Sequence, residues 1–254
     1  MRKTLRSIRR MLLLLFVILS LLLTVSWVRL IMRRATPRRM KIIAQMMQGH
    51  LKAMARVCGL RIHLQGPRPE LGQSFLLLSH HVSYWDILVL GSLFPVGFMA
   101  KDSIASWPIL GPVVSLCNTI YVRRECVTSR WRSLRLLQRA VPHLSYCVFP
   151  EGTTTSAAAP RFLQWRRGNI AVLRDPGVPL WLAGLHYAEQ GVQAWIDDDA
   201  LLPHLFKALQ AISIEVVVCL EPLVVGPGDS PRRAAHEAWS QTTDLCLKAQ
   251  SAFA

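Results

Sequence analysis

Residues 75–86 read Phe-Leu-Leu-Leu-Ser-His-His-Val-Ser-Tyr-Trp-Asp, an apolar run followed by two histidines and a carboxylate. The run 75–78 predicts a buried strand, and the apolar residues 87–90 that follow Asp86 predict the start of a helix. Open α/β sheets place their binding sites where a strand ends and the next helix begins. This stretch therefore predicts an α/β fold with a site at the end of its strand.

His81 and Asp86 are the candidate chemical pair of this stretch. Five residues apart on one regular helix they would lie about 140° apart around the axis and could not meet. They can meet if His81 lies in the turn after the strand and Asp86 in the first turn of the helix. A histidine with a carboxylate partner is suited to take a proton from an alcohol. The spacing equally allows Asp86 only to stabilise the helix N-terminus.

His80 is not predicted to be the base. The residue five positions after it is Trp85, which cannot orient an imidazole. On the sequence alone, replacement of His80 by alanine is therefore expected to leave most activity.

Residues 146–153 repeat the pattern of the first stretch. They read Tyr-Cys-Val-Phe-Pro-Glu-Gly-Thr, an apolar run that ends in a carboxylate and a glycine. The carboxyl ends of parallel strands meet at one edge of a sheet. We therefore expect the two polar ends to lie close together.

These stretches are part of an ordered set that resembles the glycerolipid acyltransferase family of the lysophosphatidate (1-acyl-sn-glycerol-3-phosphate) acyltransferase type. The first motif of that family is N-H-x-x-x-x-D and the third is F-P-E-G-T. Between them the family has a lysine after a strand, a W-P-x-x-G element and a strand that ends in arginine, which match Lys101, residues 107–111 and residues 119–124 here. An apolar block around a proline follows at residues 178–183. Four motifs in one order are a specific signal.

The resemblance implies an enzyme that moves a fatty acyl group from acyl-CoA or acyl carrier protein to the hydroxyl of lysophosphatidate, giving phosphatidate. In that reaction His81 is the general base and Asp86 orients it. The residues implied to bind substrate are Lys101, Arg124, Glu151, Gly152 and Thr153. No serine or cysteine stands in a nucleophile turn, so direct attack without an acyl-enzyme is expected. We expect no cofactor and no metal site.

Two departures from the family pattern bear on the acceptor. The motif histidine is usually preceded by asparagine, which is His80 here, and many lysophosphatidate enzymes have arginines after the F-P-E-G-T motif, where this chain has residues 154–156, Thr-Thr-Ser. Family members that act on other lysophospholipids or on lyso-ornithine lipid show similar continuations, so these remain alternative acceptors. A lipid-binding protein without activity is a third reading, but it would not need the His81–Asp86 pair.

Positive charge is concentrated at the N-terminus. The formal net charge is +15, yet 15 of the 30 basic residues lie in residues 1–69 and no acidic residue precedes Glu70. This basic segment surrounds residues 11–28, which carry no charge and predict a membrane helix over about residues 11–32. Because no small-x-small cleavage site follows, we expect an anchor rather than a signal peptide. Nucleic acid is not an expected partner, since the rest of the chain is neutral.

A second helix is predicted over about residues 40–58, where apolar residues recur at helical spacing among lysines and arginines. Such a helix can lie on the bilayer or pack against the protein, and the sequence favours neither. Residues 1–59 are thus predicted to be a membrane-anchoring segment with membrane lipids as partners. We expect a bacterial inner-membrane location with the catalytic domain on the cytoplasmic face, where thioester donors are made.

Residues 60–254 are predicted to form one catalytic domain with a mostly parallel central sheet flanked by helices. Six cysteines show no C-x-x-C spacing and are expected to be reduced. The expected strands are 60–65, 74–79, 96–100, 118–123, 145–149, 179–186 and 213–220, and the expected helices are near 84–94, 128–140, 168–174 and 232–249.

Overall fold

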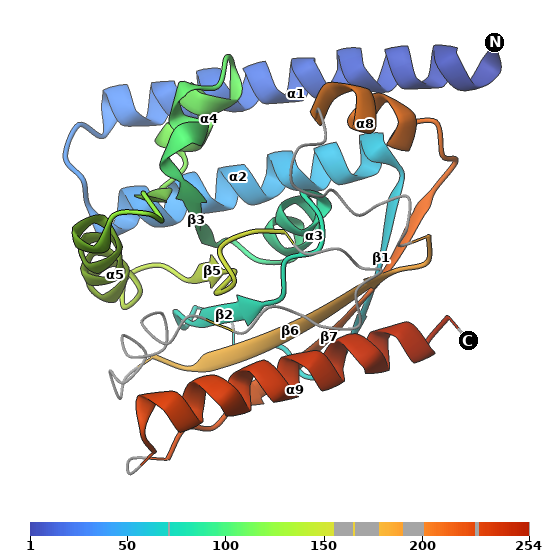
Figure 1. Cartoon of the computed structure of the whole chain (residues 1–254). Helices are drawn as coiled ribbons and strands as arrows, with labels where there is room; N and C mark the ends of the chain where they lie inside the picture. The colour runs from blue at the N-terminus through green and yellow to red at the C-terminus, as the bar shows by residue number, and fades with distance from the viewer. Residues whose placement is uncertain (71, 155–164, 166–177, 190–200, 227–228, 254) are drawn as a thin grey trace.

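In a computed structural model, the chain forms a single seven-stranded sheet with helices on both faces (Figure 1). The structure describes all residues except 71, 155–164, 166–177, 190–200, 227–228 and 254. The predicted helix at residues 168–174 lies outside the described residues.

The sheet is mostly parallel, which confirms the predicted fold class. Its strand order is β1-β7-β6-β2-β5-β3-β4, and among the strands that the structure describes only the β6–β7 pair is antiparallel. All seven predicted strands are present, with ends that differ by at most three residues. The strands are β1 (Leu60–Gln65), β2 (Leu76–Ser79), β3 (Gly97–Lys101), β4 (Ile120–Val122), β5 (Tyr146–Val148), β6 (Leu180–Tyr187) and β7 (Ile214–Leu223).

The described helices include short ones that the sequence did not reveal. Helices α4 and α8 and the 3₁₀ helix η1 have eight residues or fewer, too few for an apolar period to be recognised. The helices are α1 (Arg2–Ile31), α2 (Pro37–Cys58), α3 (Trp85–Leu93), η1 (Asp102–Ser106), α4 (Leu110–Leu116), α5 (Val127–Ala140), α8 (Leu201–Ala208) and α9 (Pro231–Ser251).

The two faces of the sheet bury separate hydrophobic clusters. Strand side chains alternate between faces, so Leu76 and Leu78 join the cluster with α5 and α9, while Leu77 joins the cluster with α1, α2 and α3. Because both faces are covered, the central strands are continuous apolar runs rather than alternating ones. This is why the sequence pattern of 75–78 identified a buried strand.

Helix α2 packs against the protein, which decides one of the alternatives left open by the sequence. Its apolar side chains Ile43, Met47, Leu51 and Met54 are buried in the cluster that includes α3. The helix begins at Pro37, a position where no helical hydrogen bond needs the missing N–H. Thr36 is the N-cap, and its side chain accepts a hydrogen bond from the Arg39 amide.

Helix α1 begins at Arg2 rather than near residue 11 and lies along α2 (Figure 1). One side of α1 buries Leu14, Leu21 and Val25 against the protein. The other side exposes large apolar residues along the whole helix, including Phe16 and Leu23, each 70% exposed. Among the described residues α1 is the one helix long and apolar enough to cross a membrane, by length and composition.

Arginines of α1 bind the ends of other helices. The Arg10 guanidinium donates to the carbonyls of Leu209, Ala211 and Ile212 just after α8, at 3.1, 2.6 and 3.0 Å. Arg29 donates to the carbonyl of Leu116 at the end of α4. Helix C-termini carry unsatisfied carbonyls and partial negative charge, which cations stabilise. The basic N-terminus therefore fixes α1 to the protein as well as supplying surface charge.

Helix α9 covers strands β6 and β7 and approaches β6 most closely at Gly184. A Cβ placed on Gly184 would lie 2.4 Å from the backbone nitrogen of Cys246 and 2.4 Å from the carbonyl carbon of Leu245. Neither atom can move without a shift of the whole helix. Glycine is therefore required at this position for the helix to pack on the sheet.

We predict that Gly184→Ala destabilises the protein by about 1–3 kcal/mol or more, because overpacking against backbone cannot be relieved by a rotamer change. The matched control is Gly49→Ala on the exposed side of α2, where no atom lies within 4 Å of the added methyl group. That change should be neutral or stabilising by up to about 1 kcal/mol. Denaturant unfolding of both variants measures the difference, and equal stabilities would contradict the close-packing explanation.

Candidate active site

The carboxyl ends of β2, β5, β3 and β4 lie side by side at one edge of the sheet. These four strands are consecutive in the strand order and mutually parallel. The turn 80–84 follows β2, the F-P-E-G-T motif begins just after β5, and Arg123 and Arg124 follow β4. The motifs that the sequence distributes over about 70 residues are thus brought to one place.

His81 and Asp86 form the hydrogen-bonded pair at this edge. His81 lies in the turn after β2, Asp86 is the second residue of α3, and His81 Nδ1 is 2.8 Å from Asp86 Oδ2. The Asp86 side chain is fully buried, whereas the His81 side chain is 15% exposed. With its Nδ1 proton directed at the carboxylate, the imidazole presents its basic lone pair on Nε2. A histidine that acts as a general base requires this arrangement with an orienting carboxylate.

Asp86 also organises the turn that carries His81. Its Oδ2 atom accepts hydrogen bonds from the backbone amides of Val82 at 2.8 Å and Ser83 at 3.0 Å. The helix N-cap is Tyr84, so Asp86 reaches back over the start of α3 from inside it. Asp86 therefore makes the contacts that both readings require, one with the His81 imidazole and two with backbone amides before α3.

Tyr187 is a further partner of Asp86 that the sequence analysis missed. Its hydroxyl donates to Asp86 Oδ1 at 2.7 Å, and its side chain is fully buried at the end of β6. Burial raises the pKa of Tyr187 well above its usual value, and the Asp86 charge raises it further, so the hydroxyl stays protonated. The only signal in the sequence was a tyrosine at the carboxyl end of an apolar strand.

Phe149 packs against the face of the His81 ring. Its ring stacks on the His81 imidazole with centroids 4.1 Å apart and planes at 18°. Phe149 follows β5, the neighbour of β2, so the phenylalanine of the F-P-E-G-T motif limits how far the imidazole can rotate. Asp86 and Phe149 together fix the position of His81.

His80 and Glu151 form a buried interaction that joins the two motifs. His80 Nδ1 contacts Glu151 Oε1, and the other ring nitrogen lies 3.1 Å from the Thr243 hydroxyl on α9. The second oxygen of Glu151 accepts from the His81 backbone amide at 3.4 Å. Both side chains are almost fully buried, at 2% exposure for His80 and 3% for Glu151. His80 therefore takes part in the contacts that join the two motifs, and the expectation that His80→Ala leaves most activity stays a prediction.

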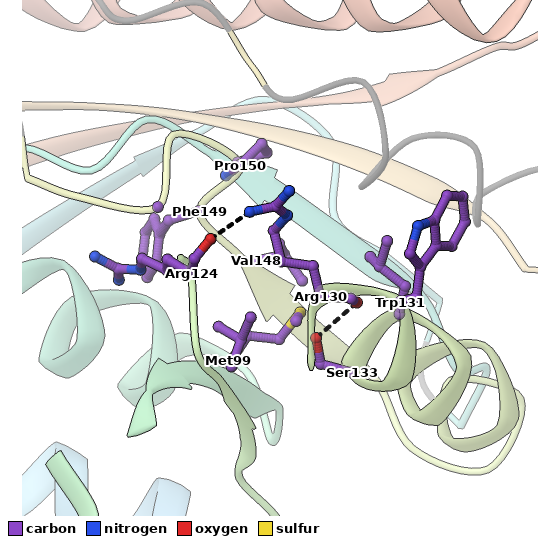
Figure 2. Close-up of a pocket in the computed structure, with 11 residues that line it drawn as sticks. Met99, Arg124, Arg130, Trp131, Ser133, Val148, Phe149 and Pro150 are labelled. Atoms are coloured by element: carbon purple, nitrogen blue, oxygen red, sulfur yellow. Dashed lines mark hydrogen bonds between the residues drawn. The ribbon is translucent and has the colours of Figure 1, made fainter. Parts of the chain in front are cut away.

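A cavity of about 220 Å³ lies beside the F-P-E-G-T motif (Figure 2). Of the residues predicted to bind substrate, Arg124 and Gly152 line it. Gly152 has φ +79, a backbone conformation that favours glycine. The full described lining is Met99, Val122, Arg124, Arg130, Trp131, Ser133, Leu134, Val148, Phe149, Pro150 and Gly152.

The remaining predicted substrate-binding residues lie outside this lining. Lys101 is exposed at the end of β3, Thr153 is half-buried just after the motif turn, and Glu151 points to His80. Arg123, the neighbour of Arg124, forms an exposed ion pair with Asp102 at 2.9 Å. The structure therefore separates the two adjacent arginines, one at the surface and one at the cavity.

We predict that His80→Ala destabilises the protein by about 3 kcal/mol, because it removes the imidazole that contacts the buried Glu151 carboxylate. His63→Ala is the matched control, since His63 pairs with Glu215 at 2.9 Å but is 57% exposed. An exposed pair should contribute less than about 1 kcal/mol. Denaturant unfolding measures both, and a similar small loss in the two variants would show that the buried pair is not structural.

The sequence is similar to known acyltransferases over the residues that form the site. The family model described as Acyltransferase matches residues 59–181, which include both motifs. A lyso-ornithine lipid O-acyltransferase of Pseudomonas aeruginosa is 32% identical over 178 residues, covering 67% of each chain. A 1-acyl-sn-glycerol-3-phosphate acyltransferase of Neisseria gonorrhoeae is 29% identical over 129 residues, covering 49% of this chain and 48% of the other.

A solved structure has the same fold over almost the whole chain. The crystal structure of the 1-acyl-sn-glycerophosphate acyltransferase of Thermotoga maritima superposes with a TM-score of 0.63 at 16% identity, covering 96% of this chain and 97% of that one. The shared fold includes the N-terminal helices. The ordered motifs, the family model and these relatives agree with the His81–Asp86 geometry. The chain therefore belongs to the glycerolipid acyltransferase family.

Proposed function

We propose that this protein transfers a fatty acyl group from an acyl thioester, acyl-CoA or acyl carrier protein, to the free hydroxyl of a lysolipid. The observation that carries the proposal is the His81–Asp86 pair at the carboxyl edge of the sheet, with Asp86 buried and His81 partly exposed. An imidazole that substrate can contact, oriented by a buried carboxylate, is suited to take a proton from a hydroxyl and to return it. A protein that only bound lipid would not need this pair.

The proposed reaction proceeds without a covalent enzyme intermediate. His81 Nε2 takes the proton of the acceptor hydroxyl as its oxygen attacks the thioester carbonyl carbon, while Asp86 stabilises the imidazolium that forms. The tetrahedral intermediate then expels the thiolate, and the imidazolium returns the proton to the sulfur. The products are the new ester and the thiol, and the base is regenerated.

Lysophosphatidate is the first candidate acceptor. Arg124 lines the cavity beside the motif turn, and its planar guanidinium suits a phosphate because it can bind two oxygens at once. No carboxylate belongs to the described lining of that cavity, so no negative charge of this lining would repel a dianionic headgroup. The product of this reaction would be phosphatidate.

Lyso-ornithine lipid is the second candidate, and the relatives favour it. The Pseudomonas aeruginosa relative and one from Rhizobium meliloti, 30% identical over 211 residues, are both lyso-ornithine lipid O-acyltransferases. An ornithine headgroup also presents a carboxylate that Arg124 could bind. Both candidates present an anionic group, a phosphate or a carboxylate, and both need the same acyl-transfer chemistry.

We further propose that α1 places the enzyme at the cytoplasmic face of a bacterial inner membrane. The support is the row of exposed apolar side chains along α1 and the excess of arginines at its ends. Apolar surface of this extent is stable in a bilayer, and the arginines suit anionic headgroups. Acyl thioester donors and lysolipids would meet at that surface.

We predict a graded loss of activity for substitutions along the chain of contacts from His81. His81→Ala should abolish transfer, and Asp86→Asn should lower kcat at least about 100-fold, because loss of tautomer control lowers kcat about 10⁴-fold in serine proteases. Tyr187→Phe removes one hydrogen bond from Asp86 and should lower kcat about 10-fold with KM little changed. Steady-state kinetics with folded variants measure the series. Full activity of His81→Ala would show that the base is misassigned.

Acceptor competition tests the finer assignment. Purified enzyme is given one acyl thioester with equal amounts of lysophosphatidate, lyso-ornithine lipid and lysophosphatidylcholine, and products are measured by mass spectrometry. We expect lysophosphatidate to have the highest kcat/KM. A tenfold or greater preference for lyso-ornithine lipid would replace lysophosphatidate with the second candidate, and a preference for lysophosphatidylcholine would contradict both. Acylation of none of the three would contradict the proposed function itself.

A further inference from the structure

Helix α5 concentrates positive charge in a part of the chain whose charges otherwise balance. Residues 70–254 hold 15 basic and 15 acidic residues, and four of the basic ones lie in the 14 residues of α5. The helix itself contains no acidic residue. The positive charge is thus a property of this helix rather than of the catalytic domain as a whole.

Three arginines form a stripe along the exposed side of α5. Arg132, Arg135 and Arg139 are all exposed, and their spacing of three and four residues places them within about 60° around the helix axis. The stripe is about 10 Å long. The same spacing places Trp131 on one side of the stripe and Leu136 on the other, exposed at 56% and 45%. We call these five residues the α5 face.

The charges of the α5 face are not compensated within the part of the chain that the structure describes. No ion pair there includes an arginine of the stripe, whereas the nearby Arg123 pairs with Asp102 at 2.9 Å. The nearest acidic residue in sequence, Glu125, precedes the helix. Neighbouring cations repel one another, so a negatively charged partner would be attracted to this face.

The α5 face is a convex helix surface rather than a pocket. None of its arginines lines the cavity beside the motif turn. Small anionic molecules bind in concave sites that surround them. An exposed stripe of arginines beside a tryptophan is instead typical of protein interfaces, where these two residue types often supply much of the binding energy. The face therefore suits an acidic protein.

The position of α5 separates this face from the proposed membrane surface. Leu137 of α5 is buried in the cluster with α9, whereas α1 is buried in the cluster on the opposite face of the sheet (Figure 1). A bilayer on the outer side of α1 would therefore lie across the sheet from α5. This arrangement favours a soluble partner for α5.

The α5 face also adjoins the cavity near His81. Trp131 lines that cavity together with Phe149 (Figure 2), and the Phe149 ring stacks on the His81 imidazole with centroids 4.1 Å apart. A protein bound to α5 would thus lie beside a cavity whose lining contacts the proposed base.

We propose that the α5 face docks the acyl carrier protein, an acidic protein that presents an acyl thioester on a flexible arm. This inference rests on the proposed function and identifies the donor and its docking surface. The two substrates then reach the enzyme from different sides. The membrane that supplies the lysolipid contacts α1, and the carrier that supplies the acyl group contacts α5.

The test compares Arg135→Glu with Arg232→Glu, the same charge reversal at an exposed arginine of α9, which covers the same face of the sheet as α5. Each variant is assayed on one lysolipid with two donors, an acyl carrier protein and acyl-pantetheine, which has the thioester arm without the acidic protein. We expect Arg135→Glu to raise KM for the carrier protein at least about tenfold, with kcat changed less than threefold, because a like charge then faces the partner. Its KM for acyl-pantetheine should stay within twofold, and Arg232→Glu should resemble wild type with both donors.

Binding of the carrier protein without an acyl group, measured by calorimetry, adds a readout that needs no turnover. Arg135→Glu should weaken this binding and Arg135→Lys, which keeps the charge, should retain most of it. Salt should weaken binding to wild type, since exposed charges are screened. This pattern would support the docking surface even if wild type acylated no lysolipid, a result that would contradict only the proposed function.

Three results would overturn the proposal. The first is an equal loss with both donors, and the second is an unchanged KM for the carrier protein in Arg135→Glu. The third is a wild-type enzyme that uses acyl-CoA but neither binds nor uses the carrier protein, which would leave the proposed function intact. Loss of binding to phosphatidylglycerol vesicles in Arg135→Glu, with carrier binding unchanged, would also overturn it and would assign the α5 face to the membrane.

Discussion

The buried carboxylate of Asp86 is the interaction on which the rest of the site depends. A fully buried charge is stable only when hydrogen-bond donors surround it, and Asp86 accepts from two backbone amides, the His81 imidazole and the Tyr187 hydroxyl. The amides fix the turn after β2, the imidazole takes its tautomer from the carboxylate, and Tyr187 ties the turn to β6. One carboxylate therefore holds the turn conformation, orients the His81 ring and joins the turn after β2 to β6.

A second buried carboxylate joins the two motifs. Glu151 follows β5 and contacts His80 and the His81 amide, which follow β2. Through His80 the contact extends to Thr243 on α9. In this chain the motif glutamate is thus engaged with the first motif, and the cations at the cavity come from Arg124 and from α5. The carboxylate that contacts the His81 turn is therefore not among the described residues that line the cavity.

The N-terminal helices pack in the same hydrophobic cluster as the turn that carries His81. Side chains of α1 and α2 are buried in one cluster with Val82 of that turn and Trp85 of α3. Arg10 and Arg29 fix α1 to the ends of α8 and α4, while its outer side stays apolar and exposed. A membrane that binds the outer side of α1 would therefore contact a helix whose inner side packs in the same cluster as the turn that carries His81.

The sequence by itself determined the sheet, the parallel strands and the His81–Asp86 pair, because apolar runs and their polar ends are local patterns. It also identified the family, since the motifs keep their order along the chain. Only the tertiary structure revealed the contacts of Tyr187 and His80. Tyr187 reaches Asp86 from 101 residues away and His80 meets Glu151 across 71. Such contacts depend on strand order and helix packing, for which a local pattern carries no signal.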